Sequence, residues 1–135
     1  MIDESLVRRL IASQFPQWSH LEIRPVAVSG WDNRTFHLGD QLLVRMPSAE
    51  KYAGQVEKEF AWLPKLAPFL PLHIPVTLVL GQPGEGYSWC WGIYRWLAGE
   101  TAAVAPITDR CEMAVSLAQF LRALHAIDST NGPLP

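Results

Sequence analysis

The spacing of apolar side chains predicts where the chain is helical and where it is extended. In residues 3–15, Leu6, Leu10 and Phe15 lie near one side of a helix, and acidic residues occupy its first turn. From Leu21 onward, apolar and polar positions alternate instead, which is the period of a half-buried strand. The chain is therefore expected to begin with an amphipathic helix that is followed by extended structure.

Five strands are predicted, and a second helix separates the third strand from the fourth. The expected ranges are strands at 21–28, 34–38, 42–46, 76–81 and 89–97, and a helix at 50–66. Gly39-Asp40 suits a two-residue type II′ turn between the second and third strands, since glycine accepts the first turn position. Pro64 is expected to kink the second helix or to restart its last turn. Consecutive hairpins favour an α+β fold in which a five-stranded antiparallel sheet has one helix packed on it.

A third helix is expected at 109–127, and it carries apolar side chains on two of its sides. One side comprises Ala114, Leu117, Ala118, Leu121 and Leu124, and the other comprises Met113, Phe120 and Ile127. A helix that is apolar on two sides is expected to be covered on both. Because only a turn-forming tail follows it here, we expect this helix to belong to a truncated lobe and to promote self-association.

Composition excludes several classes of protein. The 135 residues allow about one domain, and the 49% hydrophobic content with six Trp excludes a disordered chain. With 11 basic and 13 acidic side chains, scattered along the chain, a nucleic-acid partner is not expected. No signal peptide and no apolar stretch of about 20 residues is present, so a membrane partner is not expected either. Two cysteines without a framework favour a reducing, cytoplasmic compartment.

One acidic residue lies where the helical pattern predicts a buried face. Glu59 shares a stripe of the second helix with Val56 and Phe60 at helical spacing, and an ionised carboxylate there needs a cation. Arg45 interrupts the apolar third strand and points to the same side as Leu43. We therefore predict an internal ion pair whose guanidinium can also hold a phosphate. The alternative is that Glu59 marks the rim of the helix and that Arg45 reaches water.

The loop between the first two strands is a candidate for phosphate binding. It contains Ser29, Gly30, Trp31, Asp32 and Asn33, and its backbone N–H groups can face phosphate oxygens where Gly30 permits a close approach. A simple turn is the alternative interpretation.

The remaining polar and aromatic residues give no catalytic or metal site. The four histidines, His20, His37, His73 and His125, have no ligand spacing, and no serine has a matched His and Asp. Strand alternation places Trp89 and Trp91 on one face and Trp96 on the other, so they are expected to pack the sheet.

The order of these features resembles the N-terminal lobe and the start of the C-terminal lobe of the aminoglycoside phosphotransferase family, which are relatives of protein kinases. The resemblance covers nearly the whole chain, and it rests on Gly30-Trp31-Asp32-Asn33-Arg34-Thr35-Phe36, Leu43-Val44-Arg45-Met46-Pro47, Glu59 with Leu63 and Leu66, Ile74-Pro75, Tyr94-Arg95-Trp96-Leu97-Ala98-Gly99-Glu100 and residues 117–128. It implies a nucleotide-binding N-lobe at 1–97, a linker at 98–108, and the first helix and tail of an incomplete helical C-lobe at 109–135.

The resemblance also implies a role for each candidate residue. Residues 29–33 would cover the nucleotide phosphates, Arg45 would contact them, and Glu59 would be the helix partner of Arg45. Main-chain groups in the hinge would meet the adenine, at Arg95, Trp96 and Leu97. Many relatives have Lys where this chain has Arg45, which keeps the charge but changes the phosphate geometry.

The resemblance implies a limit as well. The family's catalytic loop, a His-Gly-Asp followed five residues later by Asn, does not occur in this sequence, and neither does the later metal-binding Asp segment. No catalytic residue is therefore expected within the chain, and the ligands for Mg²⁺ are expected beyond Pro135. His125 is expected to be a structural residue at the interface of the lobes.

Three functions are left open by the sequence. The first is the ATP-binding lobe of a phosphotransferase that transfers the γ-phosphate to the hydroxyl group of a small-molecule acceptor, inactive as residues 1–135 alone. The second is a non-catalytic kinase-like interaction or regulatory domain. The third is an unrelated α+β domain whose Trp-rich strand holds an apolar ligand.

Overall fold

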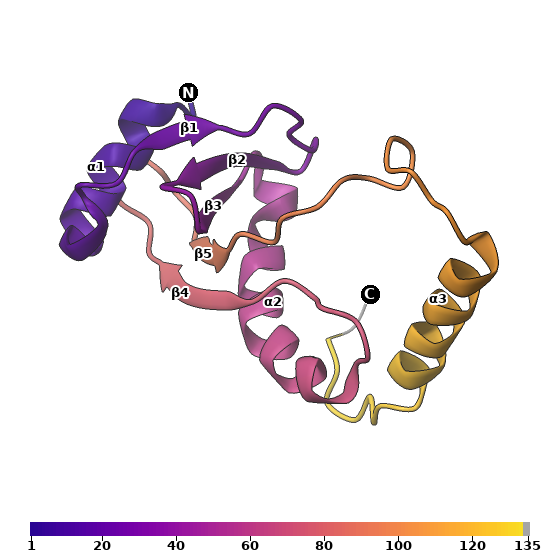
Figure 1. Cartoon of the computed structure of the whole chain (residues 1–135). Helices are drawn as coiled ribbons and strands as arrows, with labels where there is room; N and C mark the ends of the chain where they lie inside the picture. Colours follow the sequence, from indigo (N-terminus) through magenta and orange to yellow (C-terminus); the bar gives the residue numbers. More distant parts are fainter. Residues whose placement is uncertain (134–135) are drawn as a thin grey trace.

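A computed structural model of the chain describes residues 1–133 (Figure 1). Short 3-10 turns lie at Pro16–Trp18, Glu50–Tyr52 and Ala67–Phe69. The helices and strands follow the order α1 (Glu4–Gln14), β1 (Ile23–Pro25), β2 (Asn33–Leu38), β3 (Leu42–Pro47), α2 (Ala53–Leu66), β4 (Thr77–Gly81), β5 (Trp91–Arg95) and α3 (Arg110–His125).

The five strands form one antiparallel sheet in the order β1-β2-β3-β5-β4. Phe36, Val44 and Ile93 lie opposite one another across its three central strands, and the next row consists of Thr35, Arg45 and Gly92. Because neighbouring side chains on a strand point to opposite faces, Phe36 and Arg45 belong to different faces of the sheet. The predicted α+β fold with a five-stranded antiparallel sheet is confirmed.

One face of the sheet is covered by α1. Asp3, which was predicted to lie in the first turn, instead precedes the helix and caps it, because its side chain accepts a hydrogen bond from the Leu6 amide at 2.9 Å. Leu10 and Ile11 are fully buried against the face that carries Phe36 and Val44. Burial of each such side chain stabilises the fold by roughly 1.5–3 kcal/mol, so α1 is an integral part of the core.

The opposite face is approached by α2. Val56 is buried, and the ring of Phe60 meets Tyr94 of β5 edge-on, with 5.4 Å between the ring centres. Gly92 makes this approach feasible, because a Cβ atom there would lie 2.6 Å from the Tyr94 ring and 2.7 Å from the Phe60 ring. The amphipathic stripe predicted for this helix therefore faces the sheet.

Several predicted boundaries are wrong in detail. The first strand is confined to Ile23–Pro25 rather than 21–28, and the fifth to Trp91–Arg95 rather than 89–97. Leu38 pairs with Leu42, so three residues rather than two form the turn between β2 and β3; Gly39 has a φ of +60° there. Pro64 lies inside α2, which ends two residues later. Alternation of residue types continues past the point where a partner strand is available, and this explains the overlong predictions.

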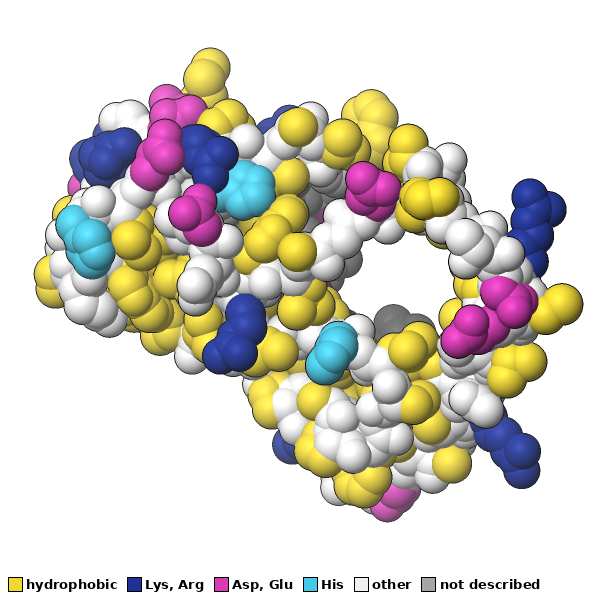
Figure 2. Space-filling model, viewed as in Figure 1, with side chains coloured by type: hydrophobic (Ala, Val, Ile, Leu, Met, Phe, Trp, Pro, Cys, Tyr) yellow, Lys and Arg dark blue, Asp and Glu magenta, His cyan; other side chains and the backbone are white. Residues whose placement is uncertain are grey.

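The third helix stands apart from the sheet. Asp109 caps α3 by accepting a hydrogen bond from the Glu112 amide at 2.9 Å. None of the residues in α3 is buried, and Figure 2 shows open space between this helix and the main body. Large apolar side chains are exposed along it at Met113, Val115, Leu117 and Leu121. Within residues 1–133, no helix is both long and apolar enough to cross a membrane.

Candidate functional site

The centre of the candidate site is an ion pair between β3 and α2. The guanidinium nitrogen Nη1 of Arg45 donates to both carboxylate oxygens of Glu59 at 2.9 Å. The Arg45 side chain is 25% exposed and that of Glu59 is 28% exposed, so the pair is largely shielded while still reaching solvent on one side. The ion pair predicted from the misplaced charges is confirmed. The alternative, in which both groups face bulk water separately, is wrong.

A tyrosine completes this cluster. The hydroxyl group of Tyr94 donates to Oε2 of Glu59 at 2.7 Å, and its ring centre lies 5.0 Å from the guanidinium carbon of Arg45. Burial, reinforced by the neighbouring Glu59 carboxylate, raises the pKa of Tyr94 far above its ordinary value. Tyr94 therefore remains a hydrogen-bond donor at neutral pH, and it holds Oε2 of Glu59 together with Arg45.

The sequence analysis missed Tyr94 as a member of the cluster. The signal was available, because Tyr94 pairs with Leu43 across the sheet and therefore shares the face of Arg45. Finding it from sequence required the register of β5 against β3, which the predicted strand ends did not fix.

Two cavities meet at Arg45. The first, of 160 Å³, lies beside the end of β5, and its lining includes Leu43, Tyr94, Arg95, Trp96 and Leu97 together with Arg45. The second, of 420 Å³, lies under the loop between β1 and β2, and its lining includes Gly30, Trp31, Asp32, Asn33, Thr35 and Gln55 together with Arg45 and Glu59. The two predicted groups of site residues therefore flank a single guanidinium, with the exception of Ser29.

The loop is held at its base by Ser48, immediately after β3. The Ser48 amide donates to the Asp32 carbonyl and its hydroxyl donates to the Trp31 carbonyl, both at 2.8 Å. Ser29 does not line the cavity under the loop, because its hydroxyl donates to the Asn33 carbonyl at 2.9 Å and closes the loop internally. The side chain of Trp31 is 92% exposed. The base of the loop is thus held by hydrogen bonds, whereas the described residues leave Trp31 uncovered.

Two of the three predicted hinge amides are already engaged. The Arg95 amide donates to the Val76 carbonyl at 2.9 Å, and the Trp96 amide donates to the Gln41 carbonyl at 2.8 Å. The Leu97 amide has no backbone partner among residues 1–133. Among the three predicted hinge residues, Leu97 is therefore the one whose N–H group no backbone carbonyl of residues 1–133 engages.

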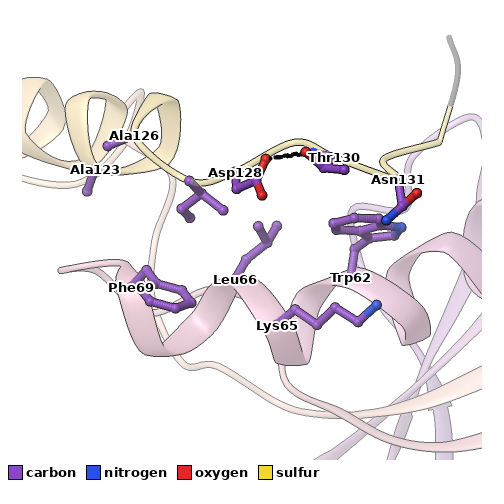
Figure 3. Close-up of a pocket in the computed structure, with 10 residues that line it drawn as sticks. Trp62, Lys65, Leu66, Phe69, Ala123, Ala126, Asp128, Thr130 and Asn131 are labelled. Carbon is purple, nitrogen blue, oxygen red and sulfur yellow. Dashed lines mark hydrogen bonds between the residues drawn. The ribbon is translucent and has the colours of Figure 1, made fainter.

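A larger cavity of 630 Å³ separates the C-terminal ends of α2 and α3 (Figure 3). From α2 and the turn after it, Trp62, Leu66 and Phe69 point toward the segment that follows α3, where Asp128 accepts two hydrogen bonds from Thr130. These bonds lower the pKa of Asp128 and hold its carboxylate in place. The walls are mainly apolar, so this cavity does not suit a polyphosphate.

The residues set aside by the sequence analysis contribute little to a catalytic site. In the described part of the chain, no group of three or more His, Cys, Asp or Glu is arranged to hold a metal ion. Trp91 is fully buried and donates to the Gln82 carbonyl at 3.0 Å, so it is not open to an apolar ligand. His125 is exposed at the end of α3, next to the residues that line the large cavity rather than among them.

The fold and the site together are those of a protein-kinase-like N-terminal lobe. This lobe has a five-stranded antiparallel sheet, an ion pair that joins the third strand to the following helix, and a loop over that pair. Residues 22–135 match the family model described as the phosphotransferase enzyme family. The chain belongs to this family. A comparison with curated proteins finds no match.

Solved structures of aminoglycoside and macrolide phosphotransferases share the fold. A GDP complex of an aminoglycoside 2'-phosphotransferase-IIIa variant is 22% identical with a TM-score of 0.84, over 95% of this chain and 43% of that one. A complex of an aminoglycoside phosphotransferase with GDP and kanamycin is 24% identical with a TM-score of 0.80, and the match covers 92% of this chain and 42% of that one. The macrolide 2'-phosphotransferase of Brachybacterium faecium is 22% identical with a TM-score of 0.59, over 96% and 46%. The chain thus spans less than half the length of these structures.

Proposed function

We propose that this chain is the nucleotide-binding lobe of an ATP-dependent small-molecule phosphotransferase that transfers the γ-phosphate to a hydroxyl group. The observation that carries the proposal is the Arg45–Glu59 ion pair at 2.9 Å, placed between two cavities that both reach Arg45. Membership of the phosphotransferase enzyme family supports it. Residues 1–97, 98–108 and 109–135 are, in the same proposal, the N-lobe, the linker and the beginning of the helical lobe.

Arg45 would bind the phosphates of the nucleotide. Glu59 occupies only Nη1, so Nε and Nη2 have no hydrogen-bond partner among residues 1–133 and can donate to phosphate oxygens. Gly30, Trp31, Asp32 and Asn33 would cover these phosphates from above, with Ser29 closing the loop. Asn33 lines the cavity under the loop, and its Oδ1 is buried without a partner in the described chain.

The base of the nucleotide would lie in the cavity beside the end of β5. Leu97 would donate its free amide to the base edge, and Arg95 and Trp96 would form the wall behind it. Relatives of known structure are described as complexes with GDP, ADP or ATP, so GTP is the competitor against which ATP has to be tested.

Mg²⁺ belongs to the proposal for the whole protein but does not fit the residues described here. No cluster of metal-binding side chains occurs among them, and the sequence has no catalytic His-Gly-Asp loop. Phosphoryl transfer depends on charge stabilisation by metal ions and on a positioned base. We therefore expect residues 1–135 alone to bind nucleotide without turning it over.

Calorimetry of the chain with ATP, GTP and inorganic tripolyphosphate tests the nucleotide site. We expect ATP and tripolyphosphate to bind, and an Arg45→Ala variant to bind both about tenfold more weakly because charge-assisted hydrogen bonds to phosphate are lost. Arg8→Ala, an exposed arginine on α1, is the matched control and should bind as the parent does. Circular dichroism confirms that each variant is folded.

Two results would contradict the proposal. The first is an Arg45→Ala variant that binds tripolyphosphate as tightly as the parent chain. The second is steady ATP hydrolysis or phosphoryl transfer by residues 1–135, which would require a base and metal ligands that the proposal places elsewhere.

The partners and location follow from the same proposal. A nucleotide and a small-molecule acceptor are the expected ligands, and a cytoplasmic location would supply ATP and keep Cys90 and Cys111 reduced. A second copy of the chain is a further partner, because α3 exposes four large apolar side chains. The non-catalytic kinase-like domain remains the alternative, and failure of the chain to bind ATP and tripolyphosphate would favour it.

A further inference from the structure

His37 and Trp96 form an aromatic pair at the edge of the hinge cavity. Their ring centres lie 4.4 Å apart with the planes inclined by 60°. His37 belongs to β2 and Trp96 follows β5, so the pair joins two segments that are far apart in the sequence. No metal-binding, catalytic or capping role explains this contact.

The register of the sheet places the pair beside the proposed base site. His37 lies opposite Leu43 on β3, on the same face as Arg45, and Leu43 lines the 160 Å³ cavity. The Trp96 side chain lines that cavity as well, and its amide is held by the Gln41 carbonyl at 2.8 Å. The backbone of Trp96 is therefore fixed by a hydrogen bond. Trp96 forms part of the cavity wall, and its indole contacts the imidazole of His37.

We propose that Trp96 is the residue on which a purine base stacks, and that His37 is a positioning residue that holds the indole in place for it. This inference rests on the proposed nucleotide site, and it adds a physical reason for that site to select a purine base. A planar bicyclic base has a large π-face to stack on an indole, whereas the phosphates and ribose have none. The other apolar walls, Leu43, Pro75 and Leu97, favour the same flat ligand over a hydrated one.

Different residues would recognise the base of the nucleotide and its phosphates. Trp96 and His37 affect the base, whereas Arg45 affects the phosphates. Adenosine reports on the first half, inorganic tripolyphosphate reports on the second, and ATP reports on both.

Binding of these three probes to the full chain tests the proposal. We expect Trp96→Ala to weaken the binding of adenosine and ATP about tenfold, since stacking on an aromatic ring is lost, and to leave the binding of tripolyphosphate unchanged. His37→Ala is expected to weaken adenosine and ATP roughly fourfold through a less constrained indole. His37→Phe, which keeps an aromatic ring against Trp96, should restore parental affinity.

Two further measurements exclude a merely structural effect. His20→Ala, an exposed histidine before β1, is the matched control and should bind all three probes as the parent does. A Trp96→Phe variant identifies the indole N–H resonance of Trp96 in NMR spectra. Adenosine is expected to shift this resonance and to leave that of the buried Trp91 unchanged.

Each outcome of the experiment decides between the possibilities. If Trp96→Ala weakens the binding of adenosine and tripolyphosphate equally, or of neither, the stacking role of Trp96 is overturned. The same results for His37→Ala would overturn the positioning role of His37. Binding of tripolyphosphate but not of adenosine by the parent chain would overturn the stacking site while leaving the phosphate site of the proposed function in place. Failure of the parent to bind any of the three probes would overturn both.

Discussion

Arg45, Glu59 and Tyr94 form a cluster in which each side chain depends on the other two. Glu59 receives three hydrogen bonds, two from Arg45 and one from Tyr94, and the aromatic ring contacts the guanidinium. Such a cluster contributes little when intact, since desolvation offsets the attraction, but removal of one member leaves the others unpaired. The cluster therefore sets the position of the arginine more than it stabilises the fold.

Glu59→Ala is expected to lower the free energy of unfolding by about 2 kcal/mol, because Arg45 and the Tyr94 hydroxyl group lose their partner in a shielded position. The figure lies below that for a fully buried pair, since both side chains of the ion pair retain some exposure. Urea denaturation measures the change. Glu57→Ala, on the exposed side of the same helix, is the control and should change the free energy by less than about 0.5 kcal/mol. A Glu59 variant as stable as this control would show that the cluster has no structural role.

Stability is expected to decrease above about pH 10, the ordinary pKa of tyrosine. Burial raises the pKa of Tyr94 and of Tyr87, whose hydroxyl group donates to the Pro47 carbonyl at 2.8 Å. With a folded-state pKa above the unfolded one, each tyrosine contributes stability that is complete below pH 10. It is lost with rising pH, at about 1.4 kcal/mol per pH unit once the unfolded state ionises. Urea unfolding between pH 8 and 11.5 should show a shallower decline for Tyr94→Phe than for the parent, and equal slopes would contradict the assignment.

At the scale of elements, the approach of α2 to the sheet depends on one small residue. Gly92 lies opposite Arg45 and beneath the rings of Tyr94 and Phe60. A side chain at this position would displace one of these rings. Because Phe60 and Glu59 are neighbours on α2, displacement of the helix also displaces the partner of Arg45.

Gly92→Ala is accordingly expected to lower the free energy of unfolding by about 1–3 kcal/mol, the usual effect of overpacking. Gly54→Ala, in the first turn of α2, is the matched control, since a Cβ atom there meets nothing within 4 Å. Alanine in a helix favours folding over glycine by roughly 0.5–1 kcal/mol, so this variant should be slightly more stable than the parent. Thermal denaturation measures the melting temperature of both variants. A Gly92→Ala variant with the same melting temperature as Gly54→Ala would contradict the packing described for α2.

Element types could be predicted from the sequence, because each has a strong local signal. The stripe that contains Leu6 and Leu10 predicts a helix, the alternation around Val44 predicts a strand, and the charge of Glu59 on an apolar stripe predicts its partner. Strand ends and the role of Tyr94 could not be predicted, because both depend on which strands become neighbours. The amides of the predicted hinge show the same limit, since only tertiary contacts decide that Arg95 and Trp96 are engaged while Leu97 has no backbone partner among residues 1–133.

At the scale of the whole molecule, the apolar surface is distributed unequally. The sheet and α1 enclose the core and α2 packs on the other face of the sheet, whereas α3 lies across open space with its apolar side chains exposed (Figure 2). Monomeric proteins seldom expose a helix with so many large apolar side chains. This surface is therefore where we expect a second copy of the chain to bind.

Light scattering at increasing protein concentration is expected to show a mass that rises above the monomer. Leu117→Lys, at an exposed apolar position in the middle of α3, should return the chain to a monomer without loss of melting temperature. Gln119→Lys adds the same charge at an exposed polar position of the same helix and should leave the association unchanged. A parent chain that remains monomeric at high concentration would exclude this surface as a contact between copies.

Ser48 joins the loop over the candidate site to the strand that carries Arg45, through its amide and its hydroxyl group. The two carbonyl groups that it holds belong to Trp31 and Asp32, so the second half of the loop is restrained before any ligand arrives. Ordering a free loop costs conformational entropy for each residue that becomes fixed. In this lobe that penalty is confined to the tip of the loop, so a triphosphate that binds as proposed would meet a largely preorganised receptor.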